Sequence, residues 1–147
     1  MLKRSWAALA FVVACAVNGV AQEQPAFSIP FRELESYKKA GREWRNIVVD
    51  QKIKRDDLVR LARELHAAYP ETPFHIFTDD GKFREFMQHD LRRPDPAYAY
   101  PEEWAERHYV ADINGIWRRG GQRWVLYPAG PKGKKFVPQG ETAIAEL

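Results

Sequence analysis

The chain has 147 residues, of which 45% are hydrophobic, 29% charged and 13% aromatic, and its formal net charge is +3. This length predicts one domain of ordinary size, and the composition excludes a disordered, collagen-like or disulfide-rich chain. Five Trp, six Tyr and eight Phe residues supply enough bulky apolar material for one hydrophobic core. None of these quantities points to a catalytic activity.

The first 21 residues have the three-part pattern of a secretory signal peptide. A short positively charged segment precedes an uncharged apolar run over residues 6–17, and Gly19 and Ala21 are small residues at the positions that a signal peptidase reads. A transmembrane helix needs about 20 apolar residues, so this run is too short to be a membrane anchor. We therefore predict export, cleavage after Ala21 and a disordered spacer over residues 22–26.

The same segment allows a second interpretation. Residues 12–15, Val-Val-Ala-Cys, resemble the lipobox of bacterial lipoproteins, in which the cysteine is lipidated and becomes the N-terminus. Lipidation at Cys15 would anchor the protein to the cell envelope. Cleavage after Ala21 would instead remove the one cysteine of the chain, and with it any disulfide, thiolate nucleophile or cysteine-ligated metal.

The domain is expected to span residues 27–128 and to begin with a β-hairpin. Residues 27–35 are predicted as a strand or a short helix, and the Lys-Lys-Ala-Gly sequence at 38–41 as a turn. Residues 44–50 contain the β-rich sequence Ile-Val-Val and are predicted as a strand.

The clearest element is a helix that follows this hairpin. Apolar residues recur at three- and four-residue steps, at Leu58, Leu61, Leu65 and Ala68. Ile53 has the spacing of a hydrophobic staple around a cap near Lys54. The Tyr69-Pro70 dipeptide is expected to end the helix.

The rest of the domain alternates short strands with short helices. The predicted elements are, in chain order, a strand (74–78), an amphipathic helix (83–87), an extended loop with three prolines (91–101), a helix beginning at Pro101, and two strands (108–113 and 123–127) around a Gly120-Gly121 turn. Residues 129–147 are rich in Gly and Pro and are predicted to form a flexible basic tail.

The order β-β-α-β-α-β-β predicts an α+β fold. We expect a single small domain with a four- to five-stranded mixed or antiparallel sheet and with helices packed on one face. One right-handed crossover is expected to join the strands that contain Val49 and Ile76, as parallel neighbours.

Packing motifs between Trp44 and Asp79 carry a resemblance to other proteins. These motifs are Ile47-Val48-Val49, Asp57-Leu58, Leu61-Ala62, Leu65, Tyr69-Pro70 and Phe74-His75-Ile76-Phe77. The run resembles small exported bacterial proteins of unknown function, which share a hydrophobic strand, one helix ending near Tyr-Pro, and an aromatic strand ending in an acidic residue. The likeness extends through Trp104 and the last two strands. It implies export and an α+β fold, and it brings no known activity or catalytic residue.

Histidine and aspartate residues form one set of candidate functional residues. His75 and Asp79 share a face of the predicted strand, and His89-Asp90 could meet His75 in space. A metal-dependent or acid/base hydrolase could use His75, Asp79 and His89. The structural alternative is that Asp79 and Asp80 form a turn and cap the next helix. The four histidines show no HExxH or HxH spacing, and the two serines after residue 21 lie in no nucleophile motif. We therefore predict neither a metal nor a cofactor.

The strongest positive feature is the basic, aromatic C-terminal third. Residues 113–140 contain six basic residues, no acidic residue and several interleaved aromatic residues. We expect a ligand-binding surface on the last hairpin, with Trp117 and Trp124 as stacking residues and with three cations, Arg118, Arg119 and Arg123. The structural alternative places the tryptophans in the core and leaves the arginines solvated.

These observations predict a binding or interaction module rather than an enzyme. Nucleic acid is the usual ligand of a basic, aromatic pattern, but export would separate this protein from the chromosome, so we expect no nucleic-acid partner. An anionic envelope polymer or a protein partner fits better, and no transmembrane helix is expected in the mature chain. The alternatives are the hydrolase described above and a structural subunit that pairs through a sheet edge.

Overall fold

The computed structural model describes residues 26–93 and 95–147. The predicted signal peptide, Cys15 and the cleavage site after Ala21 lie outside the described residues, as does all but the last residue of the predicted 22–26 spacer. Within the two described ranges, no helix is long and apolar enough to cross a membrane.

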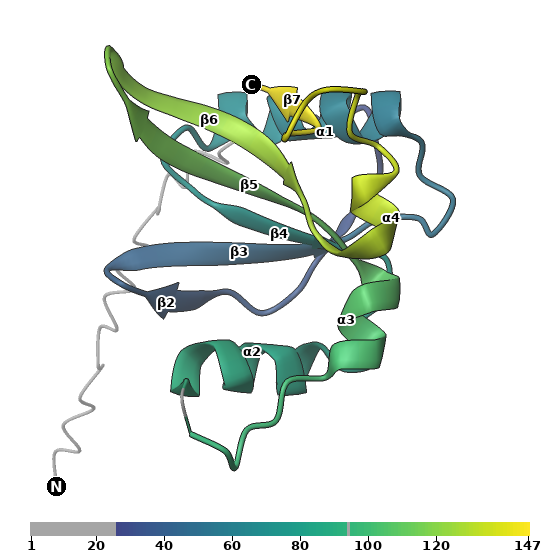
Figure 1. Ribbon diagram of the computed structural model, residues 1–147, viewed down its shortest axis with the longest axis vertical. Helices are drawn as coiled ribbons and strands as arrows, with labels where there is room; N and C mark the ends of the chain where they lie inside the picture. Colours follow the sequence, from purple (N-terminus) through teal and green to yellow (C-terminus); the bar gives the residue numbers. More distant parts are fainter. Residues whose placement is uncertain (1–25, 94) are drawn as a thin grey trace, which may run out of the picture.

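A mixed β-sheet forms the centre of the domain (Figure 1), and the predicted α+β class is confirmed. Its strand order is β1-β3-β4-β5-β6-β7, and β2 also pairs with β3. β3 and β4 are parallel, and the other pairs are antiparallel. The strands are β1 (Arg32–Glu33), β2 (Tyr37–Lys39), β3 (Arg42–Val48), β4 (Phe74–Phe77), β5 (Tyr109–Arg118), β6 (Gly121–Pro128) and β7 (Ala145–Glu146).

The sheet is larger than the predicted four or five strands, because three short strands extend it. β1, β2 and β7 contain only two or three residues each. A strand this short has no alternating pattern that a sequence could reveal. The predicted turn at 38–41 does connect two strands, and the left-handed backbone of Ala40 and Gly41 forms it.

Four helices accompany the described strands: α1 (Arg55–Ala68), α2 (Phe83–Arg92), α3 (Glu102–His108) and α4 (Gly130–Lys134). The helix predicted from the leucine spacing is confirmed as α1, with Lys54 at its N-cap and Tyr69 at its C-cap. α1 is the connection between the parallel strands β3 and β4, as predicted for the strands near Val49 and Ile76.

The helices cover both faces of the sheet, so the prediction that they pack on one face is wrong (Figure 1). Leu58, Leu61 and Leu65 of α1 pack on one face, together with Ile47, Phe74, Ile76 and Ile113. Phe83, Phe86 and Met87 of α2 pack on the opposite face, against Phe77. The reason lies in β4, whose four residues are all buried. A strand that is apolar on both faces needs cover on both.

The segment after Pro128 also differs from the predicted flexible tail. Residues 130–134 form α4, and β7 pairs with β6 through Val125↔Glu146 and Leu126↔Ala145. Ile144 is only 1% exposed and joins the core under α1. The Gly and Pro residues that suggested mobility instead form a short helix and turns that return the chain to the sheet edge.

Candidate functional site

A row of polar residues crosses four strands on the α2 side of the sheet. The strand register pairs Asn46 of β3 with His75 of β4, His75 with Asp112 of β5, and Asp112 with Tyr127 of β6. Residues paired in this way have side chains on the same face and in contact range. We call these four residues the polar row.

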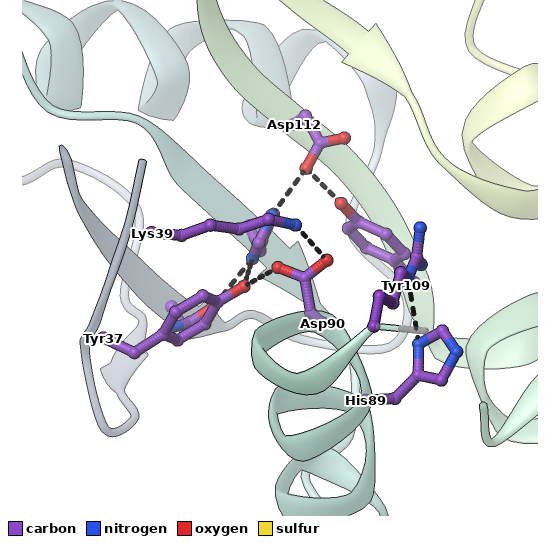
Figure 2. A network of polar contacts seen from close by, with 9 residues as sticks. Tyr37, Lys39, His89, Asp90, Tyr109 and Asp112 are labelled. Atoms are coloured by element: carbon purple, nitrogen blue, oxygen red, sulfur yellow. Dashed lines mark hydrogen bonds and ion pairs between the residues drawn. The ribbon is translucent and has the colours of Figure 1, made fainter. Parts of the chain in front are cut away.

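Helix α2 and strand β2 close one end of the polar row, as Figure 2 shows. The Tyr37 hydroxyl donates to Oδ2 of Asp90 at 2.7 Å, and Lys39 Nζ donates to Oδ1 of the same carboxylate at 2.6 Å. The Tyr37 oxygen also lies 3.3 Å from Nδ1 of His75. Tyr37 therefore connects Asp90 on α2 to the central histidine.

His75 is enclosed by aromatic rings and is only 5% exposed. Its imidazole stacks on Trp44 with ring centroids 4.4 Å apart, and Phe86 and Tyr109 contact it edge-on. Burial disfavours the charged imidazolium and lowers the pKa of His75 from 6.5 to about 3. His75 is therefore neutral at neutral pH.

The neighbouring amide determines which nitrogen of His75 carries the proton. Nδ2 of Asn46 donates to the backbone carbonyl of Glu35 at 2.8 Å, so Oδ1 of Asn46 faces Nδ1 of His75 at 3.0 Å. A carbonyl oxygen only accepts, so Nδ1 of His75 is the protonated nitrogen. Nε2 is then an unprotonated acceptor, and it points toward Asp112.

Asp112 sits between this acceptor and a tyrosine hydroxyl. Its Oδ1 lies 3.7 Å from Nε2 of His75 and accepts a hydrogen bond from Tyr109. The pKa of Asp112 is raised from 3.8 to about 7, because burial and the negative charge of Asp90 together outweigh the lowering effect of the Tyr109 hydrogen bond. The side chain nevertheless keeps 28% of its surface exposed, so a ligand can reach it.

The two carboxyl groups of the site ionise over different pH ranges. Burial also opposes the ionisation of Asp90, but the hydrogen bonds from Lys39 and Tyr37 outweigh it and lower the pKa of Asp90. At neutral pH the carboxyl group of Asp90 is thus ionised, while that of Asp112 titrates near pH 7. Such a separated pair is the usual arrangement of acid and base groups at a functional site.

Of the three residues of the predicted hydrolase, only His75 belongs to this network. Oδ2 of Asp79 accepts hydrogen bonds from Trp104 Nε1 at 2.7 Å and from the backbone N–H of Gly81 at 2.8 Å, which is the structural role of a turn aspartate. His89 accepts from Arg93 at 3.2 Å (Figure 2). Within the described ranges, no group of three or more His, Cys, Asp or Glu residues is arranged to hold a metal ion.

The two predicted stacking tryptophans occupy very different environments. Trp124 is 7% exposed and stacks on His66 of α1, with ring centroids 5.1 Å apart, whereas Trp117 is 75% exposed. Trp124 therefore belongs to the core. Trp117 lies near the end of the β5–β6 hairpin and is open to contact.

The three predicted arginines line a groove of about 860 Å³, which we call the arginine groove. Ile116, Val125 and Tyr127 line its strand wall, residues 141–146 form another side, and two arginines of α1 complete it. Its cationic residues are Arg55, Arg63, Arg118, Arg119 and Arg123. Two acidic residues, Glu141 and Glu146, also line it, and Glu146 pairs with Arg123 at 3.5 Å.

The arginine groove and the exposed Trp117 side chain lie on different sides of the β5–β6 hairpin. Side chains alternate along β5, so Trp117 faces away from Arg118, and Arg119 lies in the turn. The sequence therefore identified the arginines of this groove, but not the two from α1, which lie over 50 positions earlier in the chain. Only the packing of α1 against β6, and against the segment before β7, brings them together.

No protein-family model matches the chain, and no curated protein and no solved structure is significantly similar to it. Its function therefore has to be inferred from the polar row and the arginine groove.

Proposed function

We propose that this protein is an exported bacterial binding module that holds an anionic polymer of the cell envelope in the arginine groove. The observation that carries this proposal is the convergence of five arginines from α1 and the β5–β6 hairpin on one groove with only two acidic residues. Arginine presents five N–H donors in a rigid fork that matches carboxylate and phosphate groups. A row of such groups suits a ligand with repeated negative charges.

Part of the groove is rigid before any ligand binds. Nε of Arg55 donates to the carbonyl of Phe136 at 3.0 Å, and its NH2 group donates to the carbonyl of Ile144 at 3.1 Å. These two bonds hold the guanidinium in place, and its NH1 group also pairs with the exposed carboxylate of Asp56 at 3.2 Å. A cation that is already ordered loses less conformational entropy on binding.

Other cations in the groove are available to a ligand. Across residues 26–93 and 95–147, no ion pair involves Arg63, Arg118 or Arg119. Their side chains are exposed, so each can turn toward an anion. Trp117 faces away from Arg118 and Trp124 is buried in the core, so neither tryptophan is part of the proposed surface.

Charge reversal tests the groove directly. We expect the purified protein to bind carboxymethyl-dextran but not neutral dextran, and the double variant R118E/R119E to bind at least tenfold more weakly. The matched control is K38E/R42E, which changes the net charge equally at exposed positions on the β2–β3 hairpin. Equal weakening in both variants, or no binding of any anionic dextran, would contradict the proposal.

Export depends on residues outside the described ranges and needs its own test. The intact mass of the protein recovered from the envelope fraction of its natural host should correspond to a chain that begins at Gln22. A diacylglycerol-sized addition on Cys15 would replace the soluble form with a lipid-anchored one. Full-length protein recovered from the cytoplasm would refute export.

A further inference from the structure

We infer that Asp112 and Tyr127 form a subsite at the Tyr127 end of the arginine groove, where the carboxyl group of Asp112 donates a hydrogen bond to a ligand oxyanion that is the conjugate base of a weak acid. The oxyanion is a carboxylate or a phosphate monoester. This inference rests on the proposed function, since it names the acidic group that the groove selects.

The polar row and the arginine groove meet at Tyr127. Tyr127 lines the groove, and it is the register partner of Asp112 on the neighbouring strand. Ile116 and Arg123, further along the same face of β5 and β6, line the groove as well. A polymer that follows this face from the arginines therefore arrives at Asp112, whose side chain is 28% exposed.

An ionised carboxylate at this point would repel an anionic ligand. The nearest cation of the network, Lys39, is already bound to Asp90 at 2.6 Å. Asp112 can accompany an anion only if it carries a proton, because two carboxylates in contact cannot both be ionised at low cost. The oxygen of a neutral carboxyl group can then serve as a donor instead of repelling the ligand.

The surroundings of Asp112 raise the pKa of its carboxyl group, so a large fraction is protonated near pH 7. The titratable groups that face it are supplied by β2, β4, α2, the loop before α3, β5 and β6: Tyr37, His75, Asp90, Tyr100, Tyr109 and Tyr127. None of these is a cation at neutral pH, since His75 is neutral and the others are tyrosines or an aspartate. The two cations of the network, Lys39 and Arg93, bind Asp90 and His89 instead. Burial and the charge of Asp90 thus act on Asp112 without a positive charge to oppose them.

The proton balance is simple, and no covalent bond forms or breaks. When Asp112 is already protonated, its O–H donates to an oxygen of the ligand, and no proton is exchanged with solvent. When Asp112 is ionised, binding takes up one proton from solvent. A carboxylate or phosphate monoester is basic enough to accept such a hydrogen bond strongly, whereas a sulfate ester is a far weaker base and relies on the arginines alone.

Three charged derivatives of dextran test whether the subsite prefers carboxylate and phosphate monoester groups over sulfate esters. They are carboxymethyl-dextran, dextran phosphate and dextran sulfate. Between pH 6 and pH 8, we expect the affinity for carboxymethyl-dextran to fall by about tenfold relative to dextran sulfate, because the protonated fraction of Asp112 falls by about that factor. Dextran phosphate, which gains charge near pH 6, shows whether phosphate monoesters share the subsite. The side chain at position 112 in D112N is neutral at every pH. In this variant, the affinities for carboxymethyl-dextran and for dextran sulfate should therefore depend on pH in the same way.

E141Q is the matched control, because Glu141 is an exposed acidic residue of the same groove. It removes one negative charge and should strengthen binding of all three polymers while keeping the pH response of carboxymethyl-dextran. The inference is overturned if the carboxylate and sulfate polymers respond equally to pH, or if D112N retains the difference. If polymer binding still depends on Arg118 and Arg119 in that case, the proposed function stands without the Asp112 subsite. If the natural protein binds none of the three polymers, both the proposed function and the subsite are refuted.

Discussion

Nε2 of His75 lies 3.7 Å from Oδ1 of Asp112, and the two residues are register partners on the antiparallel strands β4 and β5. The histidine is neutral with its proton on Nδ1, so it offers Asp112 a lone pair rather than a positive charge. This contact differs from an ordinary ion pair, in which a cationic histidine would hold the carboxylate ionised. The neutral histidine therefore does not oppose the raised pKa of Asp112.

The Asp112→Asn variant should change how stability depends on pH. The pKa of Asp112 is raised in the folded state from 3.8 to about 7, so between these values the folded protein binds more protons than the unfolded chain. The contribution of Asp112 to the free energy of unfolding is therefore present below pH 4 and is lost as the pH rises through 7. We expect the free energy of unfolding of D112N, relative to that of the natural protein, to be higher at pH 8 than at pH 5. Urea unfolding of both proteins at the two pH values measures this change. Glu141→Gln controls for the loss of one negative charge at an exposed carboxylate.

His75 should stay neutral well below the pH at which an exposed histidine becomes charged. Its pKa falls from 6.5 to about 3 on folding, so the unfolded chain binds the extra proton. The contribution of His75 to stability is present above pH 6.5 and is lost as the pH falls toward 3. Nitrogen-15 NMR of the imidazole at pH 5 should show a protonated Nδ1 and an unprotonated Nε2. A charged imidazolium at that pH, or the opposite tautomer, would contradict the hydrogen-bond assignment through Asn46.

The two hairpin tryptophans should respond oppositely to truncation. Trp124→Ala removes a buried indole that stacks on His66 and should lower the free energy of unfolding by about 3–5 kcal/mol. Trp117→Ala changes a side chain that is 75% exposed and should alter it by no more than about 0.5 kcal/mol. Urea titrations of both variants measure the difference, and comparable losses would show that Trp117 is also packed.

The last residues of the chain should contribute measurably to stability. Ile144 is 1% exposed and packs in the core under α1, so Ile144→Ala should cost about 2–5 kcal/mol. Gln139→Ala, at an exposed position of the same segment, is the control and should have little effect. If both variants unfold at the same urea concentration as the natural protein, residues 129–147 do form the flexible tail that their composition suggests.

Several features of this protein follow from local sequence alone. The leucine spacing of α1 and the β-rich runs of β3 and β4 are patterns among residues only a few positions apart. The structure has these elements where they are expected. The parallel pairing of β3 and β4 follows as well, because a single helix joins them and strands linked in this way tend to be neighbours. The excess of basic residues over 113–140 is also visible in the sequence, whereas the groove that Arg118, Arg119 and Arg123 line is a property of the structure.

Other features were decided only by the tertiary structure. Asp112 follows an unremarkable alanine in a predicted strand, and nothing near it in the chain distinguishes it from an ordinary solvent-facing aspartate. Its neighbours His75, Tyr37 and Asp90 come from three other elements, and the strand register and the placement of α2 bring them together. Trp117 and Trp124 look equivalent in the sequence, but the alternation of the strands and the position of α1 bury one and expose the other.

The physical reason is the range over which each interaction acts. Helical periodicity and turn formation depend on residues a few positions apart, so the sequence determines them directly. Burial, and with it the protonation of a carboxyl group, depends on which distant segments pack against that group. The charge of the chain therefore predicts an anionic ligand, while Asp112, the group that we propose selects it, acquires its surroundings only when four strands and α2 are assembled.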